Sequence, residues 1–272
     1  MYADLHIHST FSDSSRTPED IVHEAIKQQV SLLSVCDHDS IGAYERLAAA
    51  CSQNNISYVL GIELGATLKG ESYHVLAYNF DKQNNEMLGL IRHQHTQSQK
   101  DCENMIVRMC VDYPQLSLSD YISYEYPKEL GGWKYIHYAV ARGIFKTYEE
   151  AGAYIYPKYM EPSEDEISID QFCSIVKRAN GVPVLAHPGY DPQDKLRSLF
   201  RNMQDNGMEG IECFHPAHSK ESTEICVDYC RKNDLRITGG SDCHGEYDDK
   251  SEGYTIGSLH ISMDMLDLRG IV

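Results

Sequence analysis

Short apolar segments alternate with amphipathic segments over most of the chain. The strand-like runs are residues 3–8, 31–40, 56–64, 71–80, 182–188, 208–214 and 235–242. The helical patterns are residues 17–30, 41–53, 168–180, 194–206 and 220–232. Strands that alternate with helices in this order predict an α/β fold in which parallel strands are covered by outer helices. We expect the strand at 71–80 to be antiparallel, because a short connection precedes it.

The alternation stops between residues 84 and 162, where the chain is polar and rich in tyrosine and contains no parallel-strand unit. We therefore predict a helical insertion over residues 84–162 that interrupts a barrel formed by residues 1–83 and 163–272. A helical segment over the mouth of a barrel can act as a lid that determines substrate specificity.

The first strand has an unusual polar face. Side chains alternate along an extended chain, so Leu5 and Ile7 should share one face, and Asp4, His6 and His8 the other. Two imidazoles at this spacing suit a metal ion, but surface histidines on a half-exposed strand would give the same pattern. The later strands are needed to distinguish these two interpretations.

Ionisable residues recur where the later strands end. They are Asp37, His38, Asp39, Glu63, His187, Glu212, His215, Asp242 and His244, while His74 lies inside the strand at 71–80. Ligands of α/β sheets and barrels gather at the carboxyl ends of the strands, so we expect these side chains to converge at one mouth. Imidazole and carboxylate ligands suit manganese, iron or zinc. Their number predicts two or three divalent ions, as in metal-assisted phosphoryl hydrolysis.

Composition narrows the choice of partners. The 272 residues carry a formal net charge of -17, which argues against binding of long double-stranded nucleic acid but not of a small phosphorylated substrate, because bound cations reverse the local charge. The nine cysteines are scattered, as in a protein with reduced thiols. We see no signal peptide and no apolar run of membrane-spanning length, so we expect a cytoplasmic protein without membrane contact.

The order of the polar motifs resembles that of the PHP (polymerase and histidinol phosphatase) superfamily. The motifs are HIH, SD, DHD, GIE, YHVLAY, LAHP and GSDCH, and they lie on both sides of residues 84–162. Within the superfamily the chain resembles the stand-alone metal-dependent phosphoesterases, which include nucleoside 3′,5′-bisphosphate phosphatases and 5′-3′ exoribonucleases. The resemblance implies a distorted (β/α)7 TIM-like barrel with a trinuclear metal site at its mouth.

The resemblance also implies how the ligands are shared. It places His6, His8, Glu63 and Asp242 around one metal, Asp13, His38 and His244 around a second, and Glu63, His74 and His187 around a third, so that Glu63 bridges. Asp13 stands where some members of the superfamily have histidine, which favours the phosphoesterase branch. The sequences SDSS and CDHD replace the more usual Ser-Asp-Gly and Thr-Asp-His-Asp without removing a ligand.

The chemistry implied is attack of a metal-bridging water on phosphorus, with Asp13, His38, Glu63 and His215 as catalytic residues. The proton for the leaving group would come from metal-bound water, His215 or His137. His137 resembles a contact to the substrate phosphate, and Lys134, Arg142 and His215 are further candidates for substrate binding. The arginine that usually precedes this histidine is not evident, and a structural helix explains the segment around His137 equally well.

The expected substrate is a small nucleotide or a short 5′-phosphorylated oligonucleotide. Two other functions stay open, namely a histidinol-phosphate phosphatase and a non-catalytic PHP module that binds metal or a partner protein. Such modules sit in longer chains and often lose ligands, whereas this chain keeps the set.

Several polar residues near the motifs have structural explanations. Asp37 and Asp39 are expected to orient imidazoles, as carboxylates often do. Glu212 is expected to support the ligands or to contact the substrate rather than to bind metal. Cys36, Cys213 and Cys243 should face away from the ligands. His93 and His95 lie two apart in a predicted helix and so point to different sides, which suits solvated side chains.

Overall fold

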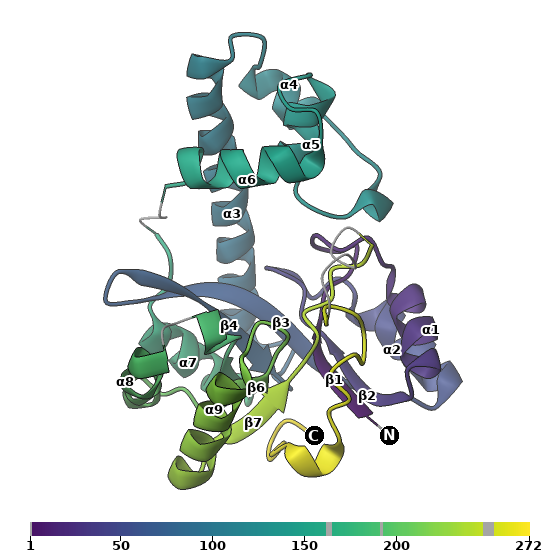
Figure 1. Ribbon diagram of the computed structural model, residues 1–272, viewed down its shortest axis with the longest axis vertical. Coiled ribbons are helices and arrows are strands. Elements are labelled where there is room, and N and C mark those ends of the chain that lie inside the picture. The colour runs from purple at the N-terminus through teal and green to yellow at the C-terminus, as the bar shows by residue number, and fades with distance from the viewer. Residues whose placement is uncertain (1, 162–164, 191–192, 247–252) are drawn as a thin grey trace.

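One seven-stranded sheet, described by the computed structural model over residues 2–161, 165–190, 193–246 and 253–272, organises the chain (Figure 1). The strands follow in chain order: β1 (Tyr2–Ile7), β2 (Val30–Val35), β3 (Ser57–Leu68), β4 (Glu71–Tyr78), β5 (Val182–Leu185), β6 (Gly210–Phe214) and β7 (Arg236–Gly239). Neighbouring strands are parallel, except that β4 is antiparallel to β3 and to β5. The predicted α/β class is confirmed, and β4 has the expected orientation.

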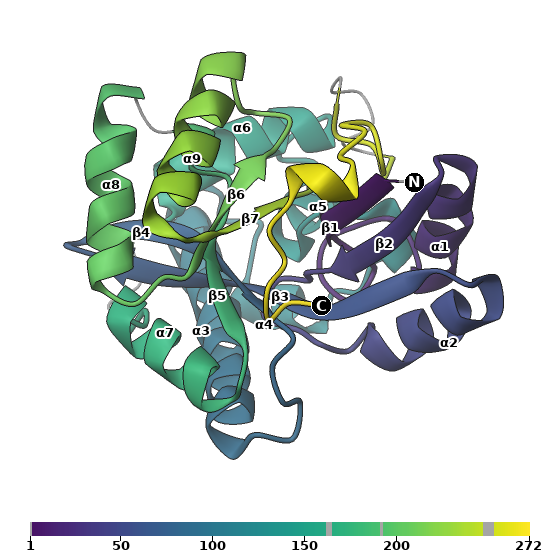
Figure 2. The same cartoon turned by 90° about the horizontal axis from the view of Figure 1, so that it is seen from below.

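Helices cover the outside of this sheet (Figure 2). They are α1 (Pro18–Lys27), α2 (Tyr44–Asn54), α7 (Ile169–Arg178), α8 (Gln193–Asp205) and α9 (Lys220–Asn233), with short 3-10 turns at Lys128–Leu130, Pro188–Tyr190 and Met263–Met265. Helix α1 begins where the sequence predicts. Thr17 Oγ1 accepts from Asp20 N at 3.2 Å, and the Asp20 carboxylate accepts from Thr17 N at 3.2 Å, so the two residues form a capping box.

The chain that follows β7 returns to β1. The amide of Asp242 donates to His6 O at 2.8 Å, and the amide of His8 donates to Cys243 O at 3.0 Å. Ile7 and Cys243 form an isolated parallel bridge. These bonds bring the end of the last strand beside the first strand, so that side chains from both edges of the sheet meet.

Leu5 and Ile7 of β1 do not share a face. Leu5 packs in a cluster with Leu32 and Tyr78, whereas Ile7 packs with Ile21 and other residues under α1 and α2. The expectation of simple alternation is therefore wrong at this point. Between Asp4 and Ile7 the strand advances by one residue more than β2 does, and such a bulge turns the following side chain to the other face.

Besides α7, four described helices connect β4 to β5, although these strands are neighbours in the sheet. They are α3 (Asn85–Asp112), α4 (Leu118–Ser123), α5 (Lys134–Ala141) and α6 (Tyr148–Tyr159). Met105, Ile106 and Met109 of α3 pack with residues of α4 to α6 in a core of their own, whereas Met87 and Leu90 pack against the sheet. Figure 1 shows α3 leading from the sheet to α4–α6. Helix α3 is thus common to both cores, and the expected boundary at residues 162 and 163 lies outside the described residues.

The cysteines are buried or partly buried, and no disulfide joins them within the described residues. Cys36, Cys213 and Cys243 each lie in an apolar cluster, turned away from the polar ends of their strands. Among the described helices, none combines the length and the apolar composition that crossing a membrane requires.

Candidate metal centre

His6 and His8 meet two carboxylates at the end of β1. The two imidazoles are fully buried, and their Nε2 atoms lie 3.2 Å apart. Glu63 Oε2 of β3 lies 3.3 Å from His6 Nε2 and 3.2 Å from His8 Nε2. Asp242 Oδ1, from the segment after β7, lies 3.1 Å from His8 Nε2 and 3.5 Å from His6 Nε2. Four potential ligands from three parts of the chain therefore face one point.

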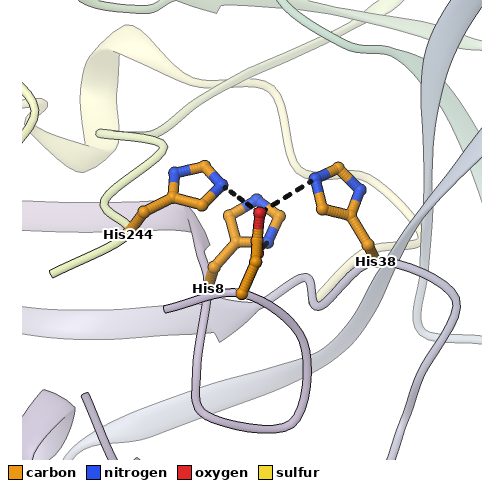
Figure 3. Close-up of side chains that lie close together, drawn as sticks. His8, His38 and His244 are labelled. Atoms are coloured by element: carbon orange, nitrogen blue, oxygen red, sulfur yellow. Dashed lines mark ion pairs between the residues drawn. The ribbon is translucent and has the colours of Figure 1, made fainter. Parts of the chain in front are cut away.

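Asp13 belongs to a second group of ligands with His8, His38 and His244, the three side chains labelled in Figure 3. Asp13 Oδ1 lies 3.6 Å from His8 Nδ1, and Asp13 Oδ2 lies 3.4 Å from His244 Nε2 and 3.9 Å from His38 Nε2. The rings of His8 and His244 stack with centroids 4.0 Å apart. His8 thus presents one ring nitrogen to each of the first two groups.

Glu63 also lies at the centre of a third group. Its Oε1 is 2.9 Å from His74 Nδ1 and 3.0 Å from His187 Nε2, and its Oε2 is 3.3 Å from His38 Nδ1. The structure therefore brings together every ligand expected from the sequence. Metal-sized groups form from His6, His8, Glu63 and Asp242, from His8, Asp13, His38 and His244, and from His38, Glu63 and His74, in each of which the ligand atoms lie within 4.8 Å of one another. His187 reaches Glu63 without joining the third group, and the assignment of each ligand to one ion stays a prediction.

The donor set fits divalent cations. His8 Nδ1 and Asp242 Oδ1 are buried without a hydrogen-bond partner in the described residues, which is costly unless an ion occupies the space between the groups. Burial would lower the pKa of His6, but Glu212, Glu63 and Asp242 hold this pKa well above its ordinary value. Burial would raise the pKa of Glu63, but His38, His74 and His6 hold it well below. Imidazole and carboxylate without thiolate suit manganese, iron or zinc.

Buried carboxylates that belong to none of the ligand groups fix the position of the ligands. Glu212 Oε1 of β6 accepts from His6 Nδ1 at 3.0 Å, and Glu212 Oε2 accepts from the amide of His187 at 2.8 Å. Contrary to expectation, Asp37 forms no hydrogen bond or ion pair with an imidazole of the described residues. It accepts instead from the amide of Ser9 at 2.7 Å and from the hydroxyl groups of Ser9 and Ser12 at 2.6 Å, and so holds the loop that leads to Asp13.

His215 contacts Asp242 and belongs to none of the three ligand groups. Its Nδ1 accepts from the amide of Ala217 at 3.1 Å, so its Nε2 is the donor to Asp242 Oδ2 at 3.3 Å. The side chain is buried and does not line the cavity. This geometry makes His215 a positioning residue for Asp242, and its catalytic role stays a prediction.

The substrate-binding candidates of α5 are engaged inside the insertion. His137 Nε2 donates to Gly131 O at 2.7 Å, and its ring stacks on Tyr126. Lys134 Nζ donates to a backbone carbonyl of α4 at 3.0 Å, and Arg142 forms two hydrogen bonds to the Asp120 carboxylate at 2.5 and 2.7 Å. None of the three lines the cavity described below, so their contact with a phosphate group stays a prediction that this geometry does not support.

A cavity of about 520 Å³ opens beside the metal ligands. Apart from the ligands, its walls contain Asp39, Gly65, Ser72, Gln94, Gln97, Ser98, Asp101, Cys102, Trp133, Tyr135, Tyr156, Met160 and Glu166. Our reading of the sequence missed the α3 residues of this wall. Gln97, Ser98 and Asp101 follow Gln94 by three, four and seven residues, which places all four on one side of a helix, and this polar stripe was the available signal.

A model of the PHP domain family matches residues 4–154. The 5′-3′ exoribonuclease of Haemophilus influenzae is 27% identical over 256 residues, which cover 89% of each chain. The phosphoribosyl 1,2-cyclic phosphate 1,2-diphosphodiesterase of Eggerthella lenta is 25% identical over 270 residues, which cover 91% of this chain and 95% of the relative. The 3′,5′-nucleoside bisphosphate phosphatase of Chromobacterium violaceum is 23% identical over 256 residues, which cover 89% and 86%.

Solved structures show the same architecture. A protein of Bifidobacterium adolescentis that is predicted to be a metal-dependent phosphoesterase superposes with a TM-score of 0.82 at 27% identity. The superposition covers 100% of this chain and 95% of that protein, so it includes the sheet and the helices between β4 and β5.

Proposed function

The chain belongs to the PHP domain family, and from this premise we propose that it hydrolyses phosphate esters of small nucleotides or short 5′-phosphorylated oligonucleotides with the help of two or three divalent metal ions. The predictions of the family and of a metal-dependent phosphoesterase are confirmed. The substrate class, the number of ions and their identity as manganese, iron or zinc belong to the proposal.

One observation carries it, namely the convergence of buried imidazoles and carboxylates on a common centre at Glu63. When bound, divalent ions supply Lewis-acid stabilisation of phosphoryl oxygens and a water of lowered pKa. The protein's own part is to hold these ligands in place. His6, His8, Glu63 and Asp242 would hold one ion, Asp13, His38 and His244 another, and Glu63 with His38 and His74 could hold a third.

The cavity supports a nucleotide substrate. Its volume of about 520 Å³ lies within the range of small-molecule sites. Trp133, Tyr135 and Tyr156 line it, and aromatic rings offer stacking surfaces for nucleobases. The named activities of the Haemophilus and Chromobacterium relatives point to the same substrate class.

A substrate screen tests the proposal. Protein loaded with manganese is incubated with nucleoside 3′,5′-bisphosphates, short 5′-phosphorylated RNA and histidinol phosphate, and released phosphate and mononucleotide are measured. We expect release from the nucleotides, and its loss in Asp13→Ala and His38→Ala. His23→Ala, on the exposed face of α1, is the matched control and should stay active.

The alternatives give different results. Turnover of histidinol phosphate alone would indicate a histidinol-phosphate phosphatase. Metal binding without turnover of any phosphate ester would indicate a non-catalytic module. Full activity of both ligand variants would exclude the metal centre as the site of the reaction.

A further inference from the structure

One wall of the cavity is rich in hydrogen-bond acceptors. Helix α3 presents Gln94 and Asp101 to it, and Asp39 and Glu166 lie beside them. Within the described residues, no lysine or arginine lines the cavity. Away from the metals, this wall therefore lacks the cations that usually bind phosphate groups.

Each carboxylate of the wall keeps one oxygen for a ligand. Asp39 Oδ2 accepts from Ser98 Oγ at 2.5 Å, Asp101 Oδ1 accepts from Gln97 Nε2 at 2.9 Å, and Glu166 Oε1 accepts from Ser72 Oγ at 2.8 Å. No described residue donates to the second oxygen of any of these three carboxylates.

The side chain of Gln94 provides independent evidence that a hydrogen-bond donor is missing at this wall. Its side chain is 5% exposed, and its Nε2 donates to Gly65 O at 2.8 Å, so its orientation is fixed. Its Oε1 is buried and has no hydrogen-bond partner in the described residues. A buried amide oxygen without a donor is costly, and a ligand with an N–H group would remove this cost.

Aromatic side chains of the insertion face the same space. Trp133 and Tyr135 line the cavity and lie with ring centroids 6.4 Å apart, and Tyr156 contributes a third ring. An aromatic surface next to an acceptor wall matches a nucleobase, which has a flat face and a polar edge.

We propose that this wall binds the edge of a nucleobase that carries an amino group, while Trp133 and Tyr135 contact its face. The inference rests on the proposed function and adds a base preference to it. Cytosine presents a 4-amino donor where uracil presents a 4-oxo acceptor. The 4-oxo group of uracil would place an acceptor against Gln94 Oε1, so cytidine nucleotides should be preferred over uridine nucleotides.

Cytidine and uridine 3′,5′-bisphosphates test this preference, because the two differ in the hydrogen-bonding edge of the base. We expect kcat/KM for the cytidine compound to be at least about tenfold higher, the value of one hydrogen bond. Gln94→Leu and Asp101→Asn should each reduce this ratio. Gln99→Leu, on the exposed side of α3, is the matched control and should keep it.

A second readout needs neither metal nor turnover. Trp133 is the only tryptophan of the chain, so its fluorescence reports on the cavity. Titration of the metal-free protein should show quenching by the cytidine nucleotide at lower concentration than by the uridine nucleotide.

The outcomes separate the two proposals. Equal kcat/KM and equal quenching for both compounds would overturn the base preference and leave the proposed function intact. A ratio that Gln94→Leu and Asp101→Asn leave unchanged would overturn the assignment to this wall. Failure to hydrolyse these nucleotides and short 5′-phosphorylated RNA as well would reject the proposed function, and the inference would fall with it.

Discussion

The carboxylate of Glu212 lies 3.0 Å from Nδ1 of His6, on the side of the ring away from the metal centre. The acceptor at Nδ1 fixes the proton there and leaves the Nε2 lone pair directed at Glu63 and Asp242. Because Glu212 also accepts from the amide of His187, one buried side chain sets the position of ligands from β1 and from the end of β5.

We expect Glu212→Gln to weaken metal binding. The amide oxygen can still accept from His6 Nδ1, but it lacks the charge that increases the basicity of the ring. Loss of such a supporting carboxylate costs roughly 10- to 100-fold in metal affinity. Isothermal titration with manganese measures the effect, and Glu224→Gln on the exposed face of α9 serves as control. Equal affinities of the two variants would show that Glu212 only fills space.

Glu63→Gln should remove more metal than His74→Ala does. Glu63 belongs to two ligand groups and reaches His187 as well, whereas His74 belongs to one. Metal per chain, measured by mass spectrometry after dialysis, should therefore fall further in the glutamate variant. Glu71→Gln, at the exposed start of β4, should keep the wild-type content. Identical losses in the two ligand variants would mean that the ions bind as a single unit.

Gly132→Ala should displace residues of the cavity wall, an effect beyond the backbone strain of an alanine at positive φ. Gly132 has φ +72°, donates to Asp13 O at 2.5 Å, and has no room for a Cβ, which would lie 2.2 Å from Tyr148 Oη. Tyr148 Oη in turn accepts from the amide of Trp133 at 2.8 Å. The alanine variant should therefore displace Trp133 and lower kcat/KM by about tenfold or more, since small misplacements in a site are costly.

The matched control for this change is Gly143→Ala. Gly143 has φ +70°, and a Cβ there would meet nothing within 4 Å. Both variants carry the cost of a left-handed alanine, about 1 kcal/mol, in their free energy of unfolding. Only Gly132→Ala should alter Trp133 fluorescence and turnover. Unchanged fluorescence in that variant would show that the contact between Gly132 and Asp13 does not determine the position of Trp133.

The centre could be foreseen from the sequence because its ligands end strands, and parallel strands place their ends together. The antiparallel β4 contributes His74 from within the strand, opposite Gly65 of β3. The same reasoning failed for Leu5 and Ile7, because a bulge interrupts the alternation and no residue type in β1 marks it.

The residues of the cavity wall could not be predicted in the same way, because their positions depend on contacts that the spacing of residues in the sequence does not reveal. Arg142 looked available for phosphate, but Asp120 of another helix in the same insertion binds its guanidinium group. Conversely, Gln94 lies on a helix whose polar stripe resembles a solvated face until the insertion folds over it. The periodicity of the sequence could not assign a role to these residues, because their role depends on how one helix packs on another.

The last prediction concerns pH and stability at His218. Its Nδ1 donates to Cys213 O at 3.0 Å, and its Nε2 accepts from the amide of Gly189 at 2.9 Å, so the folded protein holds the ring neutral. Burial lowers the pKa of His218 to about 4 from the ordinary 6.5. Between these two values the unfolded chain binds a proton that the folded chain does not, so stability falls as the pH falls from 6.5 towards 4.

At pH 5 this linkage costs about 2 kcal/mol relative to pH 7. Urea unfolding of the metal-saturated protein at both pH values measures it, and His218→Gln, which cannot take up this proton, should lose less stability between them than the wild type. His23→Gln, exposed on α1, should follow the wild type. Because other histidines titrate in both proteins, the difference between wild type and His218→Gln isolates this ring. An equal loss of stability in the two would mean that His218 already accepts a proton in the folded state.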